Sequence, residues 1–213
     1  EPARMTHRLK LLLLTRLIPF VEKNYNFIEL GPRGTGKSYA YSEMSPYCIL
    51  ISGGKASAAN LFYNNARRQV GLVGHWDVVA FDEVGGMRVT DADTIQIMKD
   101  YMANGRFSRG VTQVMADASL AFVGNLNQPV ETLVQNSASD LFQPLPKEFD
   151  LAVIDRFHYY LGLGDSEEFQ SHPHDALRLC HRLSGRGIPR AAQGQSLRRR
   201  GALLPLWLPR GGP

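Results

Sequence analysis

The sequence has 213 residues and 44% of them are hydrophobic, which excludes a disordered chain and allows one domain with a substantial buried core. The net charge of +4 arises wholly after residue 161, because residues 1–161 contain sixteen basic and sixteen acidic side chains. The net charge therefore says little about the partner of residues 1–161. The two distant cysteines exclude a disulfide framework and suit the reducing cytoplasm, where we expect the protein to act.

Strand-like and helix-like segments alternate from the first residues to about residue 161. Apolar runs such as "DVVAF" and "LAFVG" are typical of strands that helices cover on both faces. The alternation predicts an open, mainly parallel α/β sheet flanked by helices. In chain order, we expect a helix at about 5–23, a strand at 27–30, a helix from Lys37 to about Met44, a strand at 47–52, a helix at 57–66, a strand within 74–84, a helix across 91–105, a strand at 119–125 and a final strand, or strand plus turn, within 150–160.

The run "LKLLLLTRLIPFV" near the N-terminus is the candidate membrane or targeting segment. Arg16 interrupts it, it is too short to cross a bilayer, and no small-residue cleavage site follows it. We therefore expect an amphipathic helix that leads into the domain, and no membrane partner.

The stretch "GPRGTGKSY" follows the strand expected at 27–30 and precedes an expected helix. Its pattern G-x-x-x-x-G-K-S is typical of a loop whose backbone N–H groups converge on phosphate, because glycine allows that wrapping without a Cβ clash. Lys37 is expected to contact the β- and γ-phosphates of ATP, and the Ser38 hydroxyl to hold Mg²⁺. The predicted nucleotide-binding residues are Gly31, Pro32, Arg33, Gly34, Thr35, Gly36, Lys37, Ser38 and Tyr39.

A second strand delivers carboxylates to such a site. In "DVVAFDE", four apolar residues lead into Asp82 and Glu83. Asp82 is expected to hold Mg²⁺, directly or through water, and Glu83 to activate the water that attacks the γ-phosphate. The segment "DEVG" also fits the D-x-x-G element of GTPases, but the guanine-reading N-K-x-D element is replaced by "GNLNQ" on the later strand. The pattern therefore favours ATP hydrolysis.

Two further polar residues end or follow apolar runs. Asn125, at the end of "SLAFVGN", is expected to contact the γ-phosphate or the attacking water, with Asn127 as the alternative. Arg156 follows the run in "LAVIDRF" and has two interpretations. It acts as an arginine finger on the γ-phosphate of a neighbouring subunit, or it forms an ion pair within its own chain.

These residues, in this order, resemble the Walker A, Walker B, sensor 1 and arginine-finger elements of AAA+ ATPases. The segments "RLIPFVEKNYNFIELGPRGTGKSY", "GLVGHWDVVAFDEV" and "ADASLAFVGNLN" resemble, more closely, the Lon-like BrxL proteins of bacterial BREX phage-defence systems. The resemblance covers nearly all of residues 5–161. It implies an ATP-hydrolysing AAA+ core at 1–161 that forms a homo-oligomeric ring, acts on DNA and works with other BREX components. The alternative that it implies is the unfoldase module of an ATP-dependent Lon-type protease.

The stretch "GRFSRGVTQVMADASLAFVGN" is similar to the pre-sensor hairpin region of minichromosome maintenance helicases. That similarity implies that Arg106 and Arg109 contact DNA; a solvated basic loop is the alternative. After "DRFHYYL" the family pattern stops, and residues 162–213 form an Arg-, Gly- and Pro-rich stretch. We expect this stretch to be an irregular tail, from a shifted reading frame near residue 162 or from a fragment, without the family's lid, its sensor-2 arginine or a protease dyad.

Overall fold

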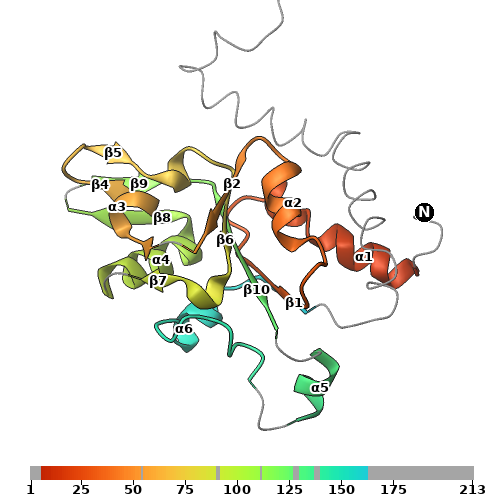
Figure 1. Ribbon diagram of the computed structural model, residues 1–213. Coiled ribbons are helices and arrows are strands. Elements are labelled where there is room, and N and C mark those ends of the chain that lie inside the picture. Colours follow the sequence, from red (N-terminus) through yellow and green to blue (C-terminus); the bar gives the residue numbers. More distant parts are fainter. Residues whose placement is uncertain are drawn as a thin grey trace, which may run out of the picture.

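A parallel sheet forms the centre of the molecule (Figure 1). The computed structural model describes residues 6–53, 55–89, 92–110, 112–126, 130–136 and 140–162. Five strands form the sheet in the order β11-β1-β10-β6-β2, and each neighbouring pair is parallel. The strands are β1 (Phe27–Gly31), β2 (Cys48–Ser52), β6 (Val78–Asp82), β10 (Ser119–Asn125) and β11 (Tyr159–Gly162). The expected α/β fold is therefore confirmed.

Helices cover both faces of this sheet. The α-helices are α1 (His7–Thr15), α2 (Lys37–Glu43), α3 (Ala58–Leu61), α4 (Ala92–Asn104), α5 (Val130–Gln135) and α6 (Leu151–Ile154). The 3-10 helices are η2 (Ile18–Phe20), η3 (Leu72–Gly74) and η4 (Val84–Gly86). No helix in the described ranges has the length and apolar character needed to cross a membrane.

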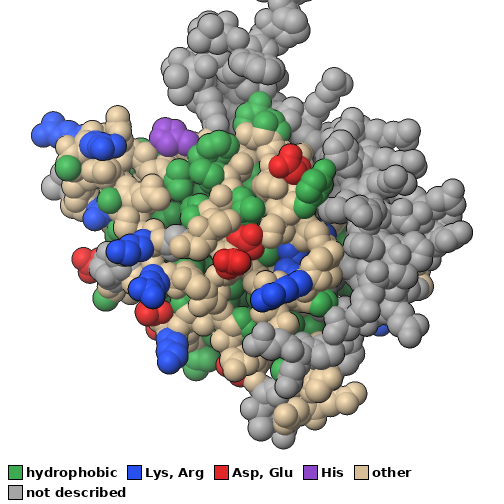
Figure 2. All heavy atoms as spheres, viewed as in Figure 1, with side chains coloured by type: hydrophobic (Ala, Val, Ile, Leu, Met, Phe, Trp, Pro, Cys, Tyr) green, Lys and Arg blue, Asp and Glu red, His purple; other side chains and the backbone are tan. Residues whose placement is uncertain are grey.

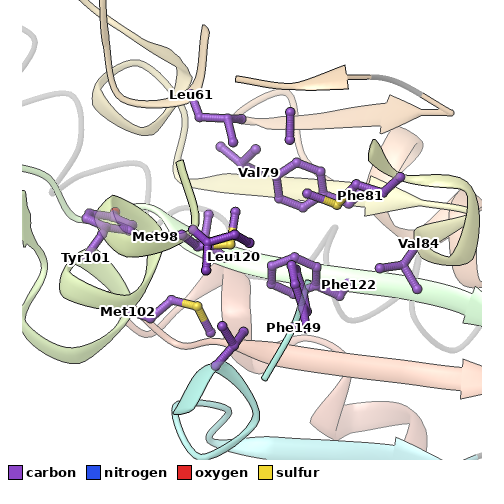
Figure 3. Close-up of a cluster of buried hydrophobic side chains, with 14 of the residues drawn as sticks. Leu61, Val79, Phe81, Val84, Met98, Tyr101, Met102, Leu120, Phe122 and Phe149 are labelled. Carbon is purple, nitrogen blue, oxygen red and sulfur yellow. The ribbon is translucent and has the colours of Figure 1, made fainter. Parts of the chain in front are cut away.

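The alternation of side chains along each strand creates two buried clusters. On the face that α1 and α2 cover, the strands contribute Phe27, Val78, Ala80, Ala121 and Val123. On the face that α3 and α4 cover, they contribute Ile28, Leu30, Val79, Phe81, Leu120 and Phe122. In this second cluster the rings of Phe81 and Phe122 stack with centroids 5.0 Å apart, and Phe149 meets Phe122 edge to face (Figure 3). The central strands are thus buried on both sides, as their apolar runs predict.

Short strands extend the molecule beyond the central sheet. β8 (Arg106–Arg109) and β9 (Thr112–Met115) form an antiparallel hairpin that carries Arg106 and Arg109. β4 (Tyr63–Asn64) pairs antiparallel with β5 (Gln69–Val70), and β3 (Lys55–Ala56) pairs parallel with β7 (Arg88–Val89).

The β4–β5 pair replaces most of the helix expected at 57–66, so that expectation is wrong after Leu61. The reason is turn chemistry. The side chain of Asn64 accepts a hydrogen bond from the backbone N–H of Arg67, and Arg68 adopts a left-handed conformation with φ of 52°. Phe62 turns into the core at the same point, where its ring meets those of Tyr101 and Phe107.

Two other expected elements differ in detail. The helix expected at 5–23 ends at Thr15, and a short 3-10 helix with Pro19 near its start follows, because proline cannot continue an α-helix from within. The strand expected within 150–160 begins only at Tyr159. Before it lies the short helix α6, whose first turn is capped by the side chain of Asp150. Residues 163–213, which include most of the expected tail, lie outside the described residues.

Candidate nucleotide site

The predicted phosphate loop connects the end of β1 to the start of α2. Gly34 and Gly36 have φ angles of 80° and 74°, a region that side chains with a Cβ rarely adopt. α2 begins directly after Gly36, and Gly36 provides no side-chain cap. Backbone N–H groups at this turn are therefore left for another acceptor, as a phosphate-binding loop requires.

Lys37 lies at the centre of this loop and is only 6% exposed. Its ammonium group donates to the carbonyl oxygens of Gly31 (3.0 Å) and Pro32 (2.5 Å) and to the hydroxyl of Thr35 (3.3 Å). All three acceptors are neutral. Burial, chiefly, lowers the pKa of Lys37 to about 8. A buried cation held only by neutral oxygens would be stabilised by a bound anion, and this observation fits a nucleotide phosphate.

Asp82 and Glu83 lie at the carboxyl end of β6. Asp82 is half-buried and its Oδ1 accepts a hydrogen bond from the backbone N–H of Glu83 at 2.9 Å. Glu83 is exposed and adopts a left-handed conformation, with φ of 50° and ψ of 48°. Such a conformation costs a non-glycine residue about 1 kcal/mol or more, and residues held in this way are concentrated at functional sites.

Asn125 lies beside the loop, because β10 runs between β1 and β6. In the register of β1 and β10, Gly31 pairs with Asn125, whose side chain is exposed. The preceding Gly124 is needed for close packing: a Cβ there would lie 2.8 Å from Leu30 and 2.9 Å from Val84. The glycine thus allows the turn after Glu83 to approach β10. The structure brings the phosphate loop, the two carboxylates and Asn125 to one end of the sheet.

The remaining loop residues face different surroundings. Thr35 is buried, Ser38 is half-buried, and Arg33 and Tyr39 are exposed, Tyr39 at 41%. The set of donors fits Mg²⁺ bound to a nucleotide, since the Ser38 hydroxyl and the Asp82 carboxylate are the hard oxygen ligands that this ion prefers. Asn127, the alternative to Asn125, lies outside the described residues.

Comparison with known proteins identifies the family. A family model described as "Lon-like protease BrxL-like, ATPase domain" matches residues 1–171. The chain belongs to this family. It is 59% identical over 162 residues to the Lon-like protease BrxL of Escherichia coli O9:H4 (strain HS). The aligned residues cover 76% of this chain and 23% of that protein. It is 55% identical over 163 residues to the Lon-like protease BrxL of Bacillus cereus (strain H3081.97), which covers 76% of this chain and 24% of that protein.

The match to the BrxL family thus confirms the resemblance found in the sequence, and it concerns an ATPase module. The chain spans about a quarter of the length of the curated relatives that it matches.

Arg156 and the phosphate loop lie at opposite ends of the central sheet. The backbone carbonyl of Arg156 accepts a hydrogen bond from Asn26, the residue before β1, whereas the loop follows the last residue of β1. The side chain donates from Nε to the carbonyl of Lys99 at 2.9 Å and from Nη1 to the carbonyl of Ala152. Arg156 is therefore held by backbone oxygens of its own chain and is not near its own phosphate loop.

The two arginines of the β8–β9 hairpin differ in their surroundings. Arg109 donates from Nη1 to the carbonyl of Tyr63 at 2.6 Å and is half-buried. Arg106 is exposed and lines a cavity of about 440 Å³ with Asp100, Asn104 and Gln113. On the face shown in Figure 2, acidic side chains near the middle of the visible surface have basic side chains on either side, so the charge there is mixed.

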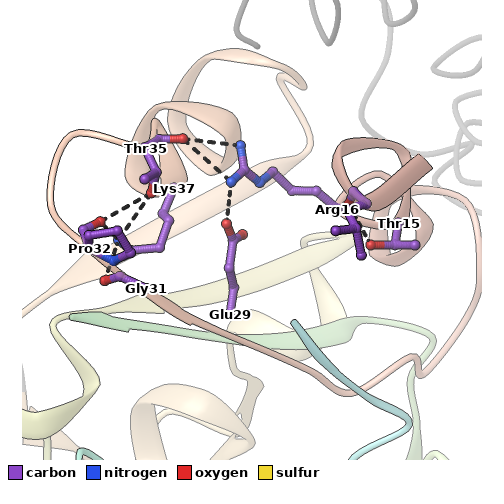
Figure 4. Close-up of polar contacts among 8 residues, drawn as sticks. Thr15, Arg16, Glu29, Gly31, Pro32, Thr35 and Lys37 are labelled. Carbon is purple, nitrogen blue, oxygen red and sulfur yellow. Dashed lines mark hydrogen bonds and ion pairs between the residues drawn. The ribbon is translucent and has the colours of Figure 1, made fainter. Parts of the chain in front are cut away.

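Two residues of the site were missed by the sequence analysis. Arg16 and Glu29 are fully buried and form an ion pair behind the phosphate loop (Figure 4). The signal that could have indicated them is Glu29 itself. A carboxylate in the middle of a strand buried on both faces requires a buried cation, and Arg16 is the basic residue within the preceding apolar run.

Proposed function

We propose that this chain binds ATP with Mg²⁺ and hydrolyses it, as the motor module of a ring that acts on DNA in bacteriophage defence. The observation that carries the proposal is Lys37, a buried ammonium group with neutral acceptors, on a loop of positive-φ glycines at the end of β1. The BrxL ATPase-domain match supports the same chemistry.

In this proposal, each residue of the site has its own role in ATP binding or hydrolysis. Backbone N–H groups of the loop and the Lys37 ammonium bind the phosphates and orient the γ-phosphate. Ser38 and Asp82 would hold Mg²⁺, which neutralises phosphate charge when it is bound. Glu83 accepts the proton of the attacking water, and Asn125 orients that water. Asp82 and Glu83 have distinct tasks because one is half-buried at the strand end and the other is exposed in the turn.

Two substitutions separate binding from hydrolysis. In the intact protein, Lys37→Ala is expected to abolish ATP binding, because the cation of the loop is lost. Glu83→Gln keeps the loop unchanged, so it should bind ATP as the wild type does and lose about 10²- to 10⁴-fold in turnover. Calorimetry and phosphate release measure the two properties. Full turnover by Glu83→Gln would remove Glu83 from its role.

The ring and the DNA rest on separate observations. Arg156 lies at the other end of the sheet from its own loop, so the phosphate on which it would act is that of a second subunit. Arg106 is an exposed cation on a hairpin, and the resemblance to BREX proteins supports DNA as the partner. Binding of the intact protein to duplex DNA should weaken with salt, and Arg106→Ala should reduce the slope of log Kd against log salt by about one.

The names of the relatives favour a second candidate. Both are Lon-like proteases, which fits an unfoldase module of an ATP-dependent protease. The two candidates differ in a simple assay. Salt-sensitive DNA binding by the intact protein favours the first, and ATP-dependent degradation of casein favours the second.

A further inference from the structure

The side chain of Arg16 joins three parts of the chain: helix α1, strand β1 and the phosphate loop. Arg16 follows the last residue of α1 and is fully buried. Its Nη2 forms the ion pair with the carboxylate of Glu29 on β1. Both terminal nitrogens also lie 3.4 Å from the backbone carbonyl oxygen of Thr35, to which they donate (Figure 4).

Strand geometry explains why Glu29 can hold this arginine. Side chains two residues apart on a strand point to the same face, so Glu29 points to the same side as Phe27. Phe27 belongs to the cluster that α1 and α2 cover. Glu29 therefore meets α1 beneath the loop, and its charge fixes the guanidinium group at the point where the planar fork of Arg16 reaches Thr35.

The contact with Thr35 orients a peptide group of the loop. The described part of the chain has no cis peptide bonds, so the Thr35–Gly36 peptide is trans and its N–H points away from its carbonyl. Arg16 binds the carbonyl, so the N–H of Gly36 faces the other side. Figure 4 shows the carbonyls of Gly31 and Pro32, to which the Lys37 ammonium group donates, on the side of Thr35 away from Arg16. The N–H of Gly36 is thus aimed toward the side from which Lys37 acts.

The charges of the pair also act on Lys37. Burial is the first cause that lowers the pKa of Lys37, Glu29 raises it and Arg16 lowers it. The cationic Arg16 and the anionic Glu29 therefore oppose each other at the ammonium group. A variant that removes both charges removes both of these influences, whereas a single substitution leaves one charge buried and unpaired.

We propose that Arg16, held by Glu29, is a positioning residue for nucleotide binding: it fixes the Thr35–Gly36 peptide so that the N–H of Gly36 points at the phosphate. The proposal rests on the proposed function of the loop in binding ATP. It also makes α1 part of the nucleotide site, since Arg16 is attached to its end.

The test uses the intact protein with the double variant Arg16→Met, Glu29→Leu, which replaces the buried pair with apolar side chains and leaves no charge unpaired. The exposed pair of Lys23 and Asp117 supplies the matched control, Lys23→Met, Asp117→Leu, which also removes one charge of each sign. The measurements are the thermal midpoint, the Kd of ATP by calorimetry, and KM and kcat for ATP hydrolysis.

The double variant should fold, with Kd and KM raised at least about tenfold, since a charge-assisted hydrogen bond to the loop is lost. Its kcat should stay within a few-fold of the wild type, because Glu83 is untouched. A role in folding alone predicts the opposite: a lower kcat from fewer active molecules and an unchanged KM. A folded double variant with unchanged Kd overturns the proposal.

Arg16→Lys provides a second test if the double variant does not fold. Lysine keeps the charge opposite Glu29 but replaces the planar fork with a single ammonium group, so KM should again rise while kcat is kept. An unchanged KM in this variant also overturns the proposal. The wild type and Lys37→Ala distinguish failure of the proposed function from failure of the Arg16 proposal, because Lys37→Ala gives the signal expected without ATP binding. A wild type that does not bind ATP refutes the proposed function. Equal binding by the wild type and the pair variants refutes only the role of Arg16.

Discussion

The polar side chains at the two ends of the central sheet differ in their burial and in their hydrogen bonds. At the amino end, Asn26 donates from its side chain to the carbonyls of Met102 and Arg156, and Arg156 donates to the carbonyl of Lys99. His158 accepts a hydrogen bond at Nδ1 from the backbone N–H of Asn26. At the carboxyl end, Lys37 is buried with neutral acceptors and Glu83 is exposed in a left-handed conformation.

This difference separates polar groups that hold the fold together from groups that we propose to bind a ligand. The amino end is held together by hydrogen bonds between side chains and backbone, and these stabilise the fold whether or not a nucleotide is bound. The carboxyl end contains a desolvated cation and a strained residue, and both lower the stability of the fold. A bound ligand that stabilises them would explain their presence. An arginine at the amino end can therefore take part in ATP hydrolysis only at the site of another subunit.

Among the tests of this division between the two ends of the sheet, the substitution of Arg156 has the largest expected effect. In the intact protein, Arg156→Ala should lower ATP turnover on the order of 10³-fold, since an arginine finger contributes at least that much to phosphoryl transfer. Glu83→Gln should be nearly inactive for a different reason. Subunits of the two variants, mixed before assembly, should recover activity, because some interfaces then pair an intact Glu83 with an intact Arg156.

The control for this experiment is the stability of Arg156→Ala, which also loses the hydrogen bonds to the carbonyls of Lys99 and Ala152. Its thermal midpoint and ATP affinity must be measured alone. Mixed assemblies that are verified by mass and show no recovered activity would leave Arg156 with a structural role within its own chain.

Much of the fold could be predicted from the sequence, because the central strands are buried on both faces and appear as continuous apolar runs. The strands at Phe27–Gly31, Val78–Asp82 and Ser119–Asn125 lie where those runs predict them. The spacing of Gly31, Gly36 and Lys37 is equally local, since a phosphate loop is built from consecutive residues.

What the sequence could not provide depends on distant contacts. Arg16 and Glu29 are thirteen positions apart, and their pairing follows from how α1 packs on the sheet. In the sequence, Arg16 is recognisable only as an interruption of an apolar run. The hydrogen bonds of Arg156 likewise involve the carbonyl of Lys99, fifty-seven positions earlier. The hairpin at Tyr63–Asn64 was missed because local turn chemistry and the burial of Phe62 outweigh helix propensity there.

A pair of identical substitutions at the two ends sharpens the comparison. Asn26→Ala leaves the carbonyls of Met102 and Arg156 without this donor in a fully buried place, and should lower the free energy of unfolding by about 2–4 kcal/mol. Asn125→Ala removes an exposed side chain at the other end, and should change stability little while it lowers turnover. Urea unfolding and phosphate release measure the two effects. A large loss of stability in Asn125→Ala, or none in Asn26→Ala, would contradict the division.

The smallest expected effect is the dependence of stability and of ATP affinity on pH, which arises from Lys37 at the carboxyl end. Burial lowers the pKa of Lys37 from 10.5 to about 8, whereas the unfolded chain keeps the ordinary value. Between these two values the unfolded state binds more protons than the folded state, so this group makes the free energy of unfolding rise with pH, by at most about 1.4 kcal/mol per pH unit. ATP affinity should move the other way. A bound phosphate stabilises the protonated lysine, so ATP binding takes up a proton, and Kd should rise by up to about tenfold per pH unit above pH 8. Unfolding of Lys37→Met, which cannot titrate at this position, should lack the extra rise in stability seen in the wild type. An ATP affinity that stays constant from pH 7 to pH 9.5 would show that the ammonium group of Lys37 does not face the phosphate.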